Sequence, residues 1–241
     1  MNIVAIFAGG VGRRMHSKDI PKQFLSMHGT PIIIHTLEHF EDHDEVDAIV
    51  IACVEDWIPY LERLIDKYNI KKVKKIVSGG STGQESIYHA LCAADDVSQG
   101  EKTIVLVHDG VRPLITAKTI TDNIASVKKY GSAITCISVT ETVLLTDENS
   151  SIDEVPDRSR SRLARAPQSF WLDEILASHR KAISESRNDF IDSCSLMQHY
   201  GKKMHLIDGP RENIKITTPE DFYIMRAMLD AKEDQQIYTI E

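Results

Sequence analysis

The sequence lacks long hydrophobic runs and is poor in cysteine. No apolar run approaches the roughly 20 residues that a membrane span needs, so we expect neither a transmembrane helix nor a membrane partner. Met1 leads directly into a strand-like run, without the cationic, apolar and small-residue succession of a signal peptide. The four cysteines lie far apart and form no C-x-x-C pair, which favours reduced core residues over a disulfide or metal framework. These absences predict a cytoplasmic protein.

Positive charge is also in short supply. The chain has 28 Lys and Arg residues against 36 Asp and Glu residues, a formal net charge of -8. A general nucleic-acid binder shows a basic face to phosphates, so this balance argues against nucleic acid as a partner. It still allows a small anionic ligand that a few local cations hold. With 241 residues, the chain is long enough to bury a proper core.

Short apolar runs alternate with helical patterns in the first half of the chain. The runs "IVAIF", "AIVIACV", "KIV", "TIVLV" and "AITCISV" are rich in β-branched residues and nearly continuous. This pattern is typical of strands buried on both faces of a parallel sheet. The alternation predicts a three-layer α/β fold with a mostly parallel central sheet and right-handed crossovers. No internal repeat or linker interrupts the chain, so we predict one domain over residues 1–241.

The alternation breaks between Thr140 and Arg165. This segment reads "TETVLLTDENSSIDEVPDRSRSRLAR", in which two apolar patches flank the turn-rich "TDENSS". The pattern predicts a protruding β-hairpin arm at about 140–165 with little core of its own. Such an arm either lies on its parent domain or reaches a neighbouring molecule.

A glycine-rich loop, "FAGGVGRRMHSKDIPKQF", follows the first predicted strand. Ligands of open α/β sheets bind beyond the carboxyl ends of strands, and Gly9, Gly10 and Gly12 would let backbone N–H groups approach phosphate oxygens. The familiar nucleotide signatures do not fit. Met15 stands where the third glycine of G-x-G-x-x-G belongs, and the Walker A spacing is absent. A nicotinamide dinucleotide site is therefore poorly supported.

Cations flank this loop. Arg13 and Arg14 follow the last glycine directly, and Lys22 stands in "PKQF". Arginine offers a planar fork for two phosphate oxygens, and lysine offers a compact point charge. A solvated basic loop, the alternative interpretation, requires neither the glycines nor the clustering. The loop therefore predicts a site for a nucleoside triphosphate.

Two further stretches follow predicted strands. "VLVHDGVRP" places Asp109 at a strand end with Arg112 after it. A carboxylate beside a phosphate loop is well placed to hold Mg²⁺, although a turn role would also explain Asp109. "SGGSTGQES" leads from the third strand into a helix, and its small residues would admit a flat base. Alone, this second signal is weak.

Six motifs together resemble one enzyme family. "AGGVGRRM", "PKQF", "GG(x)5S", "HDGVRP", "APQSF" and "NIKITTPED" occur in the order and spacing of the cytidylyltransferases of sugar-alcohol phosphates. The resemblance runs from Ile3 to about Met225. It implies a Rossmann-like nucleotidyltransferase fold, CTP and an alditol phosphate as substrates, and Mg²⁺ as cofactor. The products would be a CDP-alditol and pyrophosphate.

The resemblance also assigns roles to individual residues. It implies nucleotide contacts at Ala8, Gly9, Gly10, Gly80, Ser81 and Ser86, the last three lining the cytosine pocket. It implies catalytic roles for Arg14, Lys22, Lys215 and Asp109, with Asp109 serving the metal. It implies contacts to the alditol phosphate at Arg112, Thr142, Arg158 and Asp192. In the family the arm belongs to a homodimer, so Thr142 and Arg158 would reach the partner's site.

The family has two branches, which act on ribitol 5-phosphate and on 2-C-methyl-D-erythritol 4-phosphate. Many methylerythritol enzymes carry an arginine where this chain has Gly83. They commonly read T-D-E-A where it has "IDSCS", and Asp where it has Glu212. These differences favour ribitol 5-phosphate, with the methylerythritol substrate as the alternative. A non-catalytic nucleotide-binding module and a nicotinamide oxidoreductase remain as more remote alternatives.

Overall fold

A computed structural model describes residues 1–10 and 20–238. Its main element is a seven-stranded sheet with the order β11-β7-β10-β6-β1-β4-β5. The strands are β1 (Asn2–Ala8), β4 (Ala48–Cys53), β5 (Val73–Ser78), β6 (Ile104–Asp109), β7 (Ser132–Ser138), β10 (Arg162–Trp171) and β11 (Leu206–Asp208). Every neighbouring pair is parallel except the two that involve β10, which runs antiparallel to β6 and β7. The predicted mostly parallel α/β sheet is confirmed.

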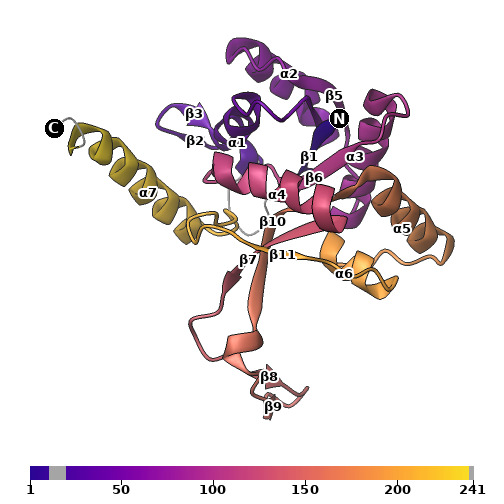
Figure 1. Ribbon diagram of the computed structural model, residues 1–241. Coiled ribbons are helices and arrows are strands. Elements are labelled where there is room, and N and C mark those ends of the chain that lie inside the picture. The colour runs from indigo at the N-terminus through magenta and orange to yellow at the C-terminus, as the bar shows by residue number, and fades with distance from the viewer. Residues whose placement is uncertain (11–19, 239–241) are drawn as a thin grey trace.

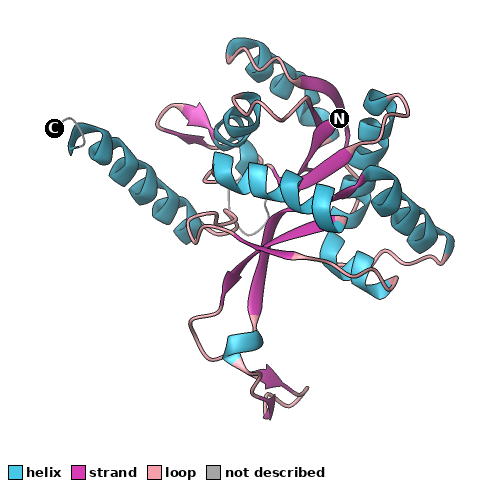
Figure 2. Ribbon diagram, in the orientation of Figure 1, coloured by secondary structure: helices cyan, strands magenta, loops and turns pink. Residues whose placement is uncertain are grey.

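Helices cover both faces of the sheet (Figures 1 and 2). One face packs against α1 (Ile32–Glu41), α2 (Ile58–Lys67) and α4 (Ala117–Tyr130). The other packs against α3 (Gly83–Ser98), α5 (Leu172–Ser184) and α6 (Ser193–His199). The last helix, α7 (Pro219–Tyr238), extends away from the sheet (Figure 1). None of the helices in the described part of the chain is long and apolar enough to cross a membrane.

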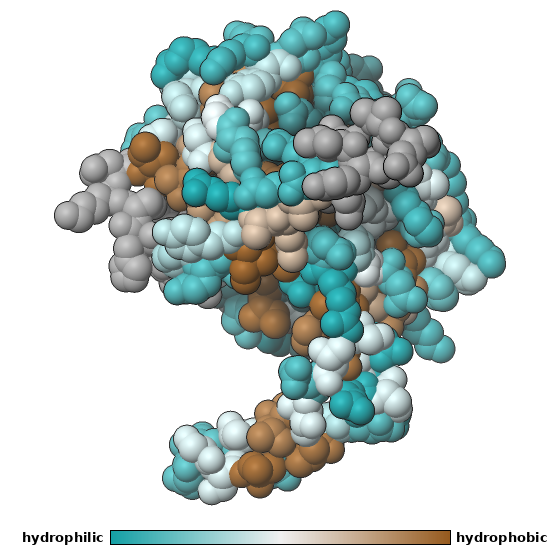
Figure 3. Space-filling view, turned by 90° about the vertical axis from the view of Figure 1, so that its left-hand side faces the viewer, coloured by the Kyte–Doolittle hydropathy of each residue, from teal (hydrophilic) through white to brown (hydrophobic). Residues whose placement is uncertain are grey.

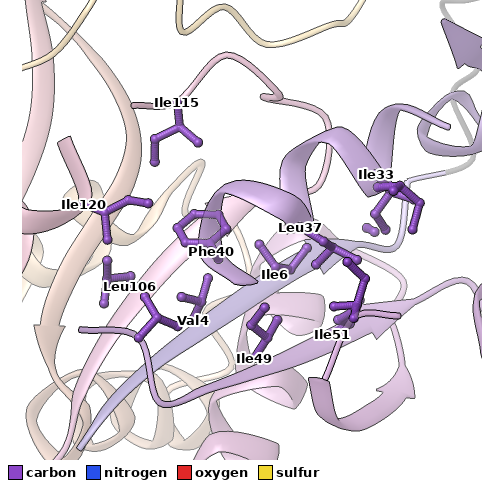
Figure 4. Packing of buried hydrophobic residues seen from close by; sticks show 14 of the residues in the cluster. Val4, Ile6, Ile33, Leu37, Phe40, Ile49, Ile51, Leu106, Ile115 and Ile120 are labelled. Carbon is purple, nitrogen blue, oxygen red and sulfur yellow. The ribbon is translucent and has the colours of Figure 1, made fainter. Parts of the chain in front are cut away.

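The apolar runs of the sequence are continuous because both faces of the central strands are buried. Alternate residues of β1 enter different clusters, with Val4 and Ile6 on one face of the sheet and Ile3 and Ala5 on the other. In Figure 4, Phe40 and its neighbours on α1 lie against the strand side chains of the first cluster. The two apolar layers fix the positions of the strand ends, and those ends carry the polar residues described below.

A third apolar cluster lies beside the carboxyl ends of the strands. It joins the β2 (Ser26–Met27) and β3 (Thr30–Pro31) hairpin to the loop after β6 and to the first turns of α7. Ile216 is fully buried in this cluster, and its N–H donates to the Val111 carbonyl over 3.0 Å. These contacts hold the segment that contains Lys215 against the end of β6.

The predicted arm protrudes from the body (Figures 1 and 3). It carries the short antiparallel pair β8 (Leu145–Thr146) and β9 (Ile152–Glu154), followed by a 3-10 helix over Arg158–Arg160. Figure 3 shows brown, hydrophobic surface on the arm. The large apolar side chains of this segment are about half exposed; they are Leu144, Leu145, Ile152, Val155 and Leu163. Because these side chains are exposed, the arm has no core within its own chain, and an isolated two-stranded hairpin is marginal in water.

Candidate active site

The loops that follow β1, β5 and β6 meet at one edge of the sheet and line a cavity of about 560 Å³. Parallel neighbouring strands bring their carboxyl ends to the same edge, as expected for a ligand site of an α/β sheet. The structure brings nine of the predicted residues to this cavity: Ala8, Gly9, Gly10, Lys22, Gly80, Ser81, Ser86, Asp109 and Lys215. The tenth predicted residue near it, Arg14, lies outside the described residues.

Two of the glycines are required by close contact between the loops after β1 and β5. A Cβ atom on Gly9 would lie 2.7 Å from the Ser86 Oγ, and one on Gly79 would lie 3.1 Å from the Gly9 Cα. The buried Ser86 hydroxyl accepts from the Gly80 N–H over 3.0 Å and donates to the Thr82 carbonyl over 2.9 Å. Ser86 therefore fixes the conformation of the loop after β5 through these two hydrogen bonds, and it also lines the cavity.

Glu85, which the sequence analysis did not select, fixes the same loop. Its carboxylate accepts from both the N–H and the hydroxyl of Ser81, each over 2.6 Å, and these bonds lower its pKa. The Thr82 side chain caps α3 by accepting from the Glu85 N–H over 3.1 Å. The loop is thus held in place before any ligand binds. The capping signal, Thr82 followed three residues later by Glu85, was readable in the sequence.

Asp109 is the centre of a buried ion-pair network. Its Oδ2 accepts from the Arg112 Nε over 2.7 Å, and its Oδ1 lies 2.5 Å from the Lys215 Nζ. Burial alone would raise the pKa of this carboxyl, but Lys215 and Arg112 outweigh burial and hold the pKa well below its usual range. Asp109 is therefore ionised at neutral pH and orients two cations toward the cavities beside it.

Lys22 contacts the segment that contains Lys215. Its Nζ donates to the Ile216 carbonyl over 3.0 Å, one residue beyond Lys215. Lys22 begins a 3-10 helix over Lys22–Phe24, directly after Pro21. The adjacent Gln23 is buried and donates to the Ala8 carbonyl over 2.7 Å, which ties this turn to the end of β1. Two lysines from distant parts of the sequence thus meet at one wall of the cavity.

The side chains of this cavity could bind Mg²⁺ only together with a phosphorylated substrate that supplies most of the ligands. Asp109 is the one carboxylate that lines the 560 Å³ cavity within the described ranges, and both of its oxygens face cations. No cluster of three or more His, Cys, Asp or Glu side chains suited to a metal occurs in that same part of the chain. Mg²⁺ commonly takes one or two carboxylates together with phosphate oxygens and water. The donor set therefore fits an ion bound mainly by phosphates.

A second cavity of about 280 Å³ adjoins the first and shares Asp109 and Lys215 with it. It contains Arg112 and Asp192, two of the residues predicted to contact an alditol phosphate. Asp192 caps α6 by accepting from the Ser195 N–H over 2.8 Å, and its other oxygen accepts from the Gln168 amide over 2.9 Å. A strand, a loop and a helix N-terminus therefore converge on this cavity.

Two predicted residues lie elsewhere. Thr142 and Arg158 are exposed on the arm and line neither cavity of their own chain. The Arg158 guanidinium instead donates to the Thr140 carbonyl over 3.2 Å. Their roles in an active site stay a prediction that requires a second chain.

The site combines a glycine-rich loop at the end of a parallel strand, two lysines that line the same cavity, and a second polar cavity alongside. This combination suits a nucleotidyltransferase, which must bind two anionic substrates side by side. Comparison with known proteins makes the class more specific. The model of the IspD family, 2-C-methyl-D-erythritol 4-phosphate cytidylyltransferase, matches residues 2–231. The chain belongs to this family, and it is a cytidylyltransferase.

Similar proteins cover both branches. The chain is 52% identical to a ribitol-5-phosphate cytidylyltransferase of Streptococcus agalactiae, over 99% of each chain. It is 38% identical to a 2-C-methyl-D-erythritol 4-phosphate cytidylyltransferase of Clostridium botulinum, over 95% of this chain and 97% of that one. The crystal structure of 4-diphosphocytidyl-2C-methyl-D-erythritol synthase from Anaerococcus prevotii has a TM-score of 0.83 and 26% identity, covering 95% of this chain and 96% of that chain.

Proposed function

We propose that this enzyme transfers the cytidylyl group of CTP to ribitol 5-phosphate, giving CDP-ribitol and pyrophosphate. The observation that carries the proposal is the graded similarity to the two branches. Four relatives named ribitol-5-phosphate cytidylyltransferase are 50–52% identical to this chain, and four named 2-C-methyl-D-erythritol 4-phosphate cytidylyltransferase are 36–38% identical. Gly83 supports the same choice. A Cβ there would meet no atom within 4 Å, so the common wall of the two cavities is open where the other branch often has an arginine.

CTP would occupy the 560 Å³ cavity. The backbone of Ala8, Gly9 and Gly10 would face its phosphates, and the small residues of the loop after β5, including Gly80 and Ser81, would face the base. Arg14 and Lys22 would neutralise phosphate charge, as expected for a cation-flanked loop. The close approach of Gly79 to Gly9 brings the two loops together at the cavity.

The reaction needs no covalent enzyme intermediate. A phosphate oxygen of ribitol 5-phosphate attacks the α-phosphorus of CTP, a new P–O bond forms, and pyrophosphate leaves with the electron pair of the broken P–O bond. Lys215 lies at the wall shared by the two cavities, where its charge would reduce repulsion between the two anionic reactants. Asp109 and Arg112 would hold Lys215 and the alditol phosphate in position.

Mg²⁺ would add positive charge at the triphosphate, with Asp109 as its protein ligand. The donor set supports this because one carboxylate and several phosphate oxygens suffice for that ion. The enzyme's own contribution is the fixed orientation of Asp109 at the end of β6 and of the lysines beside it.

We also propose that the enzyme is a cytoplasmic homodimer joined through the arm. The exposed apolar side chains of the arm, among them Leu144 and Ile152, support pairing with a second copy. The same exchange would bring Thr142 and Arg158 to the partner's 280 Å³ cavity. Exposure of both residues in a single chain agrees with this role.

The test is turnover of the purified protein with CTP and either ribitol 5-phosphate or 2-C-methyl-D-erythritol 4-phosphate, monitored by pyrophosphate release and identification of the CDP product. We expect kcat/KM for ribitol 5-phosphate to exceed that for the methylerythritol substrate by about 100-fold or more, the scale expected when buried hydrogen-bonding groups go unpaired. The reverse preference would replace the proposal with the other branch. No turnover of either would overturn it.

A further inference from the structure

We propose that Arg165 and Ser193 bind the hydroxyl groups of the alditol chain and set the enzyme's preference for a substrate with a linear chain of five carbons. This inference rests on the proposed function and names the part of the same site that reads the substrate's carbon chain. Neither residue carries a role in the resemblance described above.

Arg165 reaches the 280 Å³ cavity from the middle of β10. The pairing of β10 with β7 is interrupted between Ala164 and Gln168, and Arg165 lies inside this interruption. The two other arginines nearby, Arg160 and Arg162, are exposed, whereas Arg165 is only partly accessible. The irregularity in the ladder therefore turns one cation of a basic run inward.

The Arg165 guanidinium has no partner among the described residues. Its Nε is buried without a hydrogen bond, and the group makes no ion pair within the described part of the chain. The charged group that acts on its pKa is another cation, Arg112. Burial and this repulsion lower the pKa of Arg165, although an arginine stays charged at neutral pH. A buried donor without an acceptor costs stability. The unpaired Nε of Arg165 therefore suggests that a bound ligand supplies the acceptor.

Ser193 presents a second unused donor in the same cavity. Its Oγ is buried and has no hydrogen-bond partner in the described structure. The surrounding polar groups are already occupied. The Asp192 carboxylate accepts from the Ser195 N–H and the Gln168 side-chain amide, and the Gln168 Oε1 accepts from the Cys194 N–H over 2.8 Å. The hydroxyl of Ser193 therefore remains for a ligand.

The charges of this cavity select the class of ligand. Arg112, Arg165 and Lys215 face two carboxylates, Asp109 and Asp192. Asp109 contacts both Arg112 and Lys215 but balances only one of their two charges, while Asp192 accepts from neutral donors. The cavity thus keeps an excess positive charge beside two buried donors. A polyhydroxylated phosphate ester supplies both the anion and the acceptor oxygens.

The arrangement of the two cavities indicates where the phosphate and the carbon chain of an alditol phosphate would lie. The shared wall contains Asp109 and Lys215, where the reacting phosphate must meet CTP. Arg165, Asp192 and Ser193 line the second cavity alone. A chain that starts from a phosphate at the shared wall therefore extends toward Arg165 and Ser193, and a longer chain uses them more fully.

The experiment compares Arg165→Met and Ser193→Ala with the wild type on ribitol 5-phosphate and on the shorter D-erythritol 4-phosphate. Methionine keeps an unbranched apolar stem, and alanine removes only the hydroxyl. Arg180→Met is the matched control, since Arg180 is an exposed arginine of α5 that pairs with Asp95 and lines neither cavity. Melting temperature and the KM for CTP are measured for each variant.

We expect kcat/KM for ribitol 5-phosphate to fall about 10- to 100-fold in Arg165→Met and about 3- to 10-fold in Ser193→Ala, chiefly through KM. The ratio of kcat/KM for ribitol 5-phosphate to kcat/KM for D-erythritol 4-phosphate should fall as well. The KM for CTP should stay near the wild-type value, and Arg180→Met should behave like the wild type on both substrates. The melting temperature of Arg165→Met should be unchanged or higher, because an unpartnered buried cation is removed. An unchanged substrate ratio, or equal losses on both substrates with a lower melting temperature, would overturn this inference alone. A wild type inactive on both substrates would overturn the proposed function as well.

Discussion

The Lys215 ammonium lies 2.5 Å from a carboxylate oxygen of Asp109, although 105 residues separate the two in the sequence. Asp109 is almost fully buried and also binds Arg112, whereas the Lys215 side chain is 38% exposed toward the cavities. The buried Asp109 carboxylate therefore fixes the position of the Lys215 ammonium at the surface of the site. A triphosphate that binds there meets a positive charge that is already in place.

Removal of either lysine should cut turnover sharply. We expect Lys215→Ala and Lys22→Ala each to lower kcat by about two to four orders of magnitude, on the scale of losing one preorganised electrostatic contact. Steady-state pyrophosphate release measures the loss, and circular dichroism confirms that each variant folds. A folded variant with turnover like the wild type would contradict the role of that lysine.

Asp109→Asn should destabilise the protein while keeping the shape of the side chain. It leaves Arg112 and Lys215 close together without their anion, and we expect a loss of about 3 kcal/mol in the free energy of unfolding at pH 7. Chemical denaturation measures it. Lys118→Ala, which breaks an exposed pair with Asp122, is the control and should change the free energy of unfolding by less than about 0.5 kcal/mol.

The same variant should alter the acid unfolding of the protein. Folding lowers the pKa of Asp109, so its contribution to stability is complete above its ordinary pKa, near 4, and is lost as the pH falls below that value. We therefore expect the stability difference between wild type and Asp109→Asn to shrink below about pH 4. A difference that stays constant from pH 7 to pH 3 would show that the charge of Asp109 does not stabilise the fold.

Gly9 and Gly10 should respond differently to the same substitution. A Cβ on Gly9 would meet the Ser86 Oγ at 2.7 Å, whereas one on Gly10 would have no atom within 4 Å. We expect Gly9→Ala to cost about 1–3 kcal/mol of stability and Gly10→Ala to be close to neutral. Adding Ser86→Ala to Gly9→Ala removes the clashing oxygen and should recover part of the loss. Equal melting temperatures for the two single variants would argue against the close contact.

Turnover should require a divalent cation. We expect EDTA to abolish activity and Mg²⁺ to restore it, because one carboxylate and several phosphates suit an oxygen-ligated ion. If Asp109 is a ligand, Asp109→Asn should need more Mg²⁺ for half-maximal rate than the wild type does. Full activity in EDTA would remove the metal from the mechanism, and an unchanged Mg²⁺ requirement would remove Asp109 from the metal site.

Mixing two inactive variants tests whether the arm completes a partner's site. Subunits of Lys22→Ala and Arg158→Ala are dissociated, mixed and reassociated. If Arg158 acts across the interface, one of the two sites in each heterodimer has both an intact Lys22 and an intact Arg158, so activity returns. If Arg158 acts within its own chain, every site carries a lesion and the mixture stays inactive. Light scattering that finds a monomer at assay concentration would exclude the exchange outright.

The sequence predicts the sheet well because burial on both faces leaves a direct trace. Runs such as "TIVLV" and "AITCISV" are apolar on most residues, without a strict apolar–polar alternation, and they form most of β6 and β7. The sequence does not predict β10 as an inner strand. Its residues "RLARAPQSFW" include arginines and Pro167, which argue against an inner strand. Pro167 is tolerated because it lies where the pairing with β7 is interrupted.

Some residues of the candidate site are predictable from the sequence, and others are not. The glycine loop and Asp109 are predictable because each directly follows an apolar strand. Arg165 is not, because it ends a run of arginines and serines in which nothing local separates it from the exposed Arg160 and Arg162. Its burial arises from the irregular pairing of β10, and the contact between Asp109 and Lys215 arises from the fold as a whole.

The placement of β10 links the arm to the second cavity through one continuous strand. One end of this strand emerges from the arm, its middle carries Arg165, and its other end pairs with β6 in the centre of the sheet. In the proposed dimer, a displacement of the arm would therefore be transmitted along β10 to the wall of the 280 Å³ cavity. Subunit association and binding of the sugar alcohol would then influence each other through the backbone of this strand.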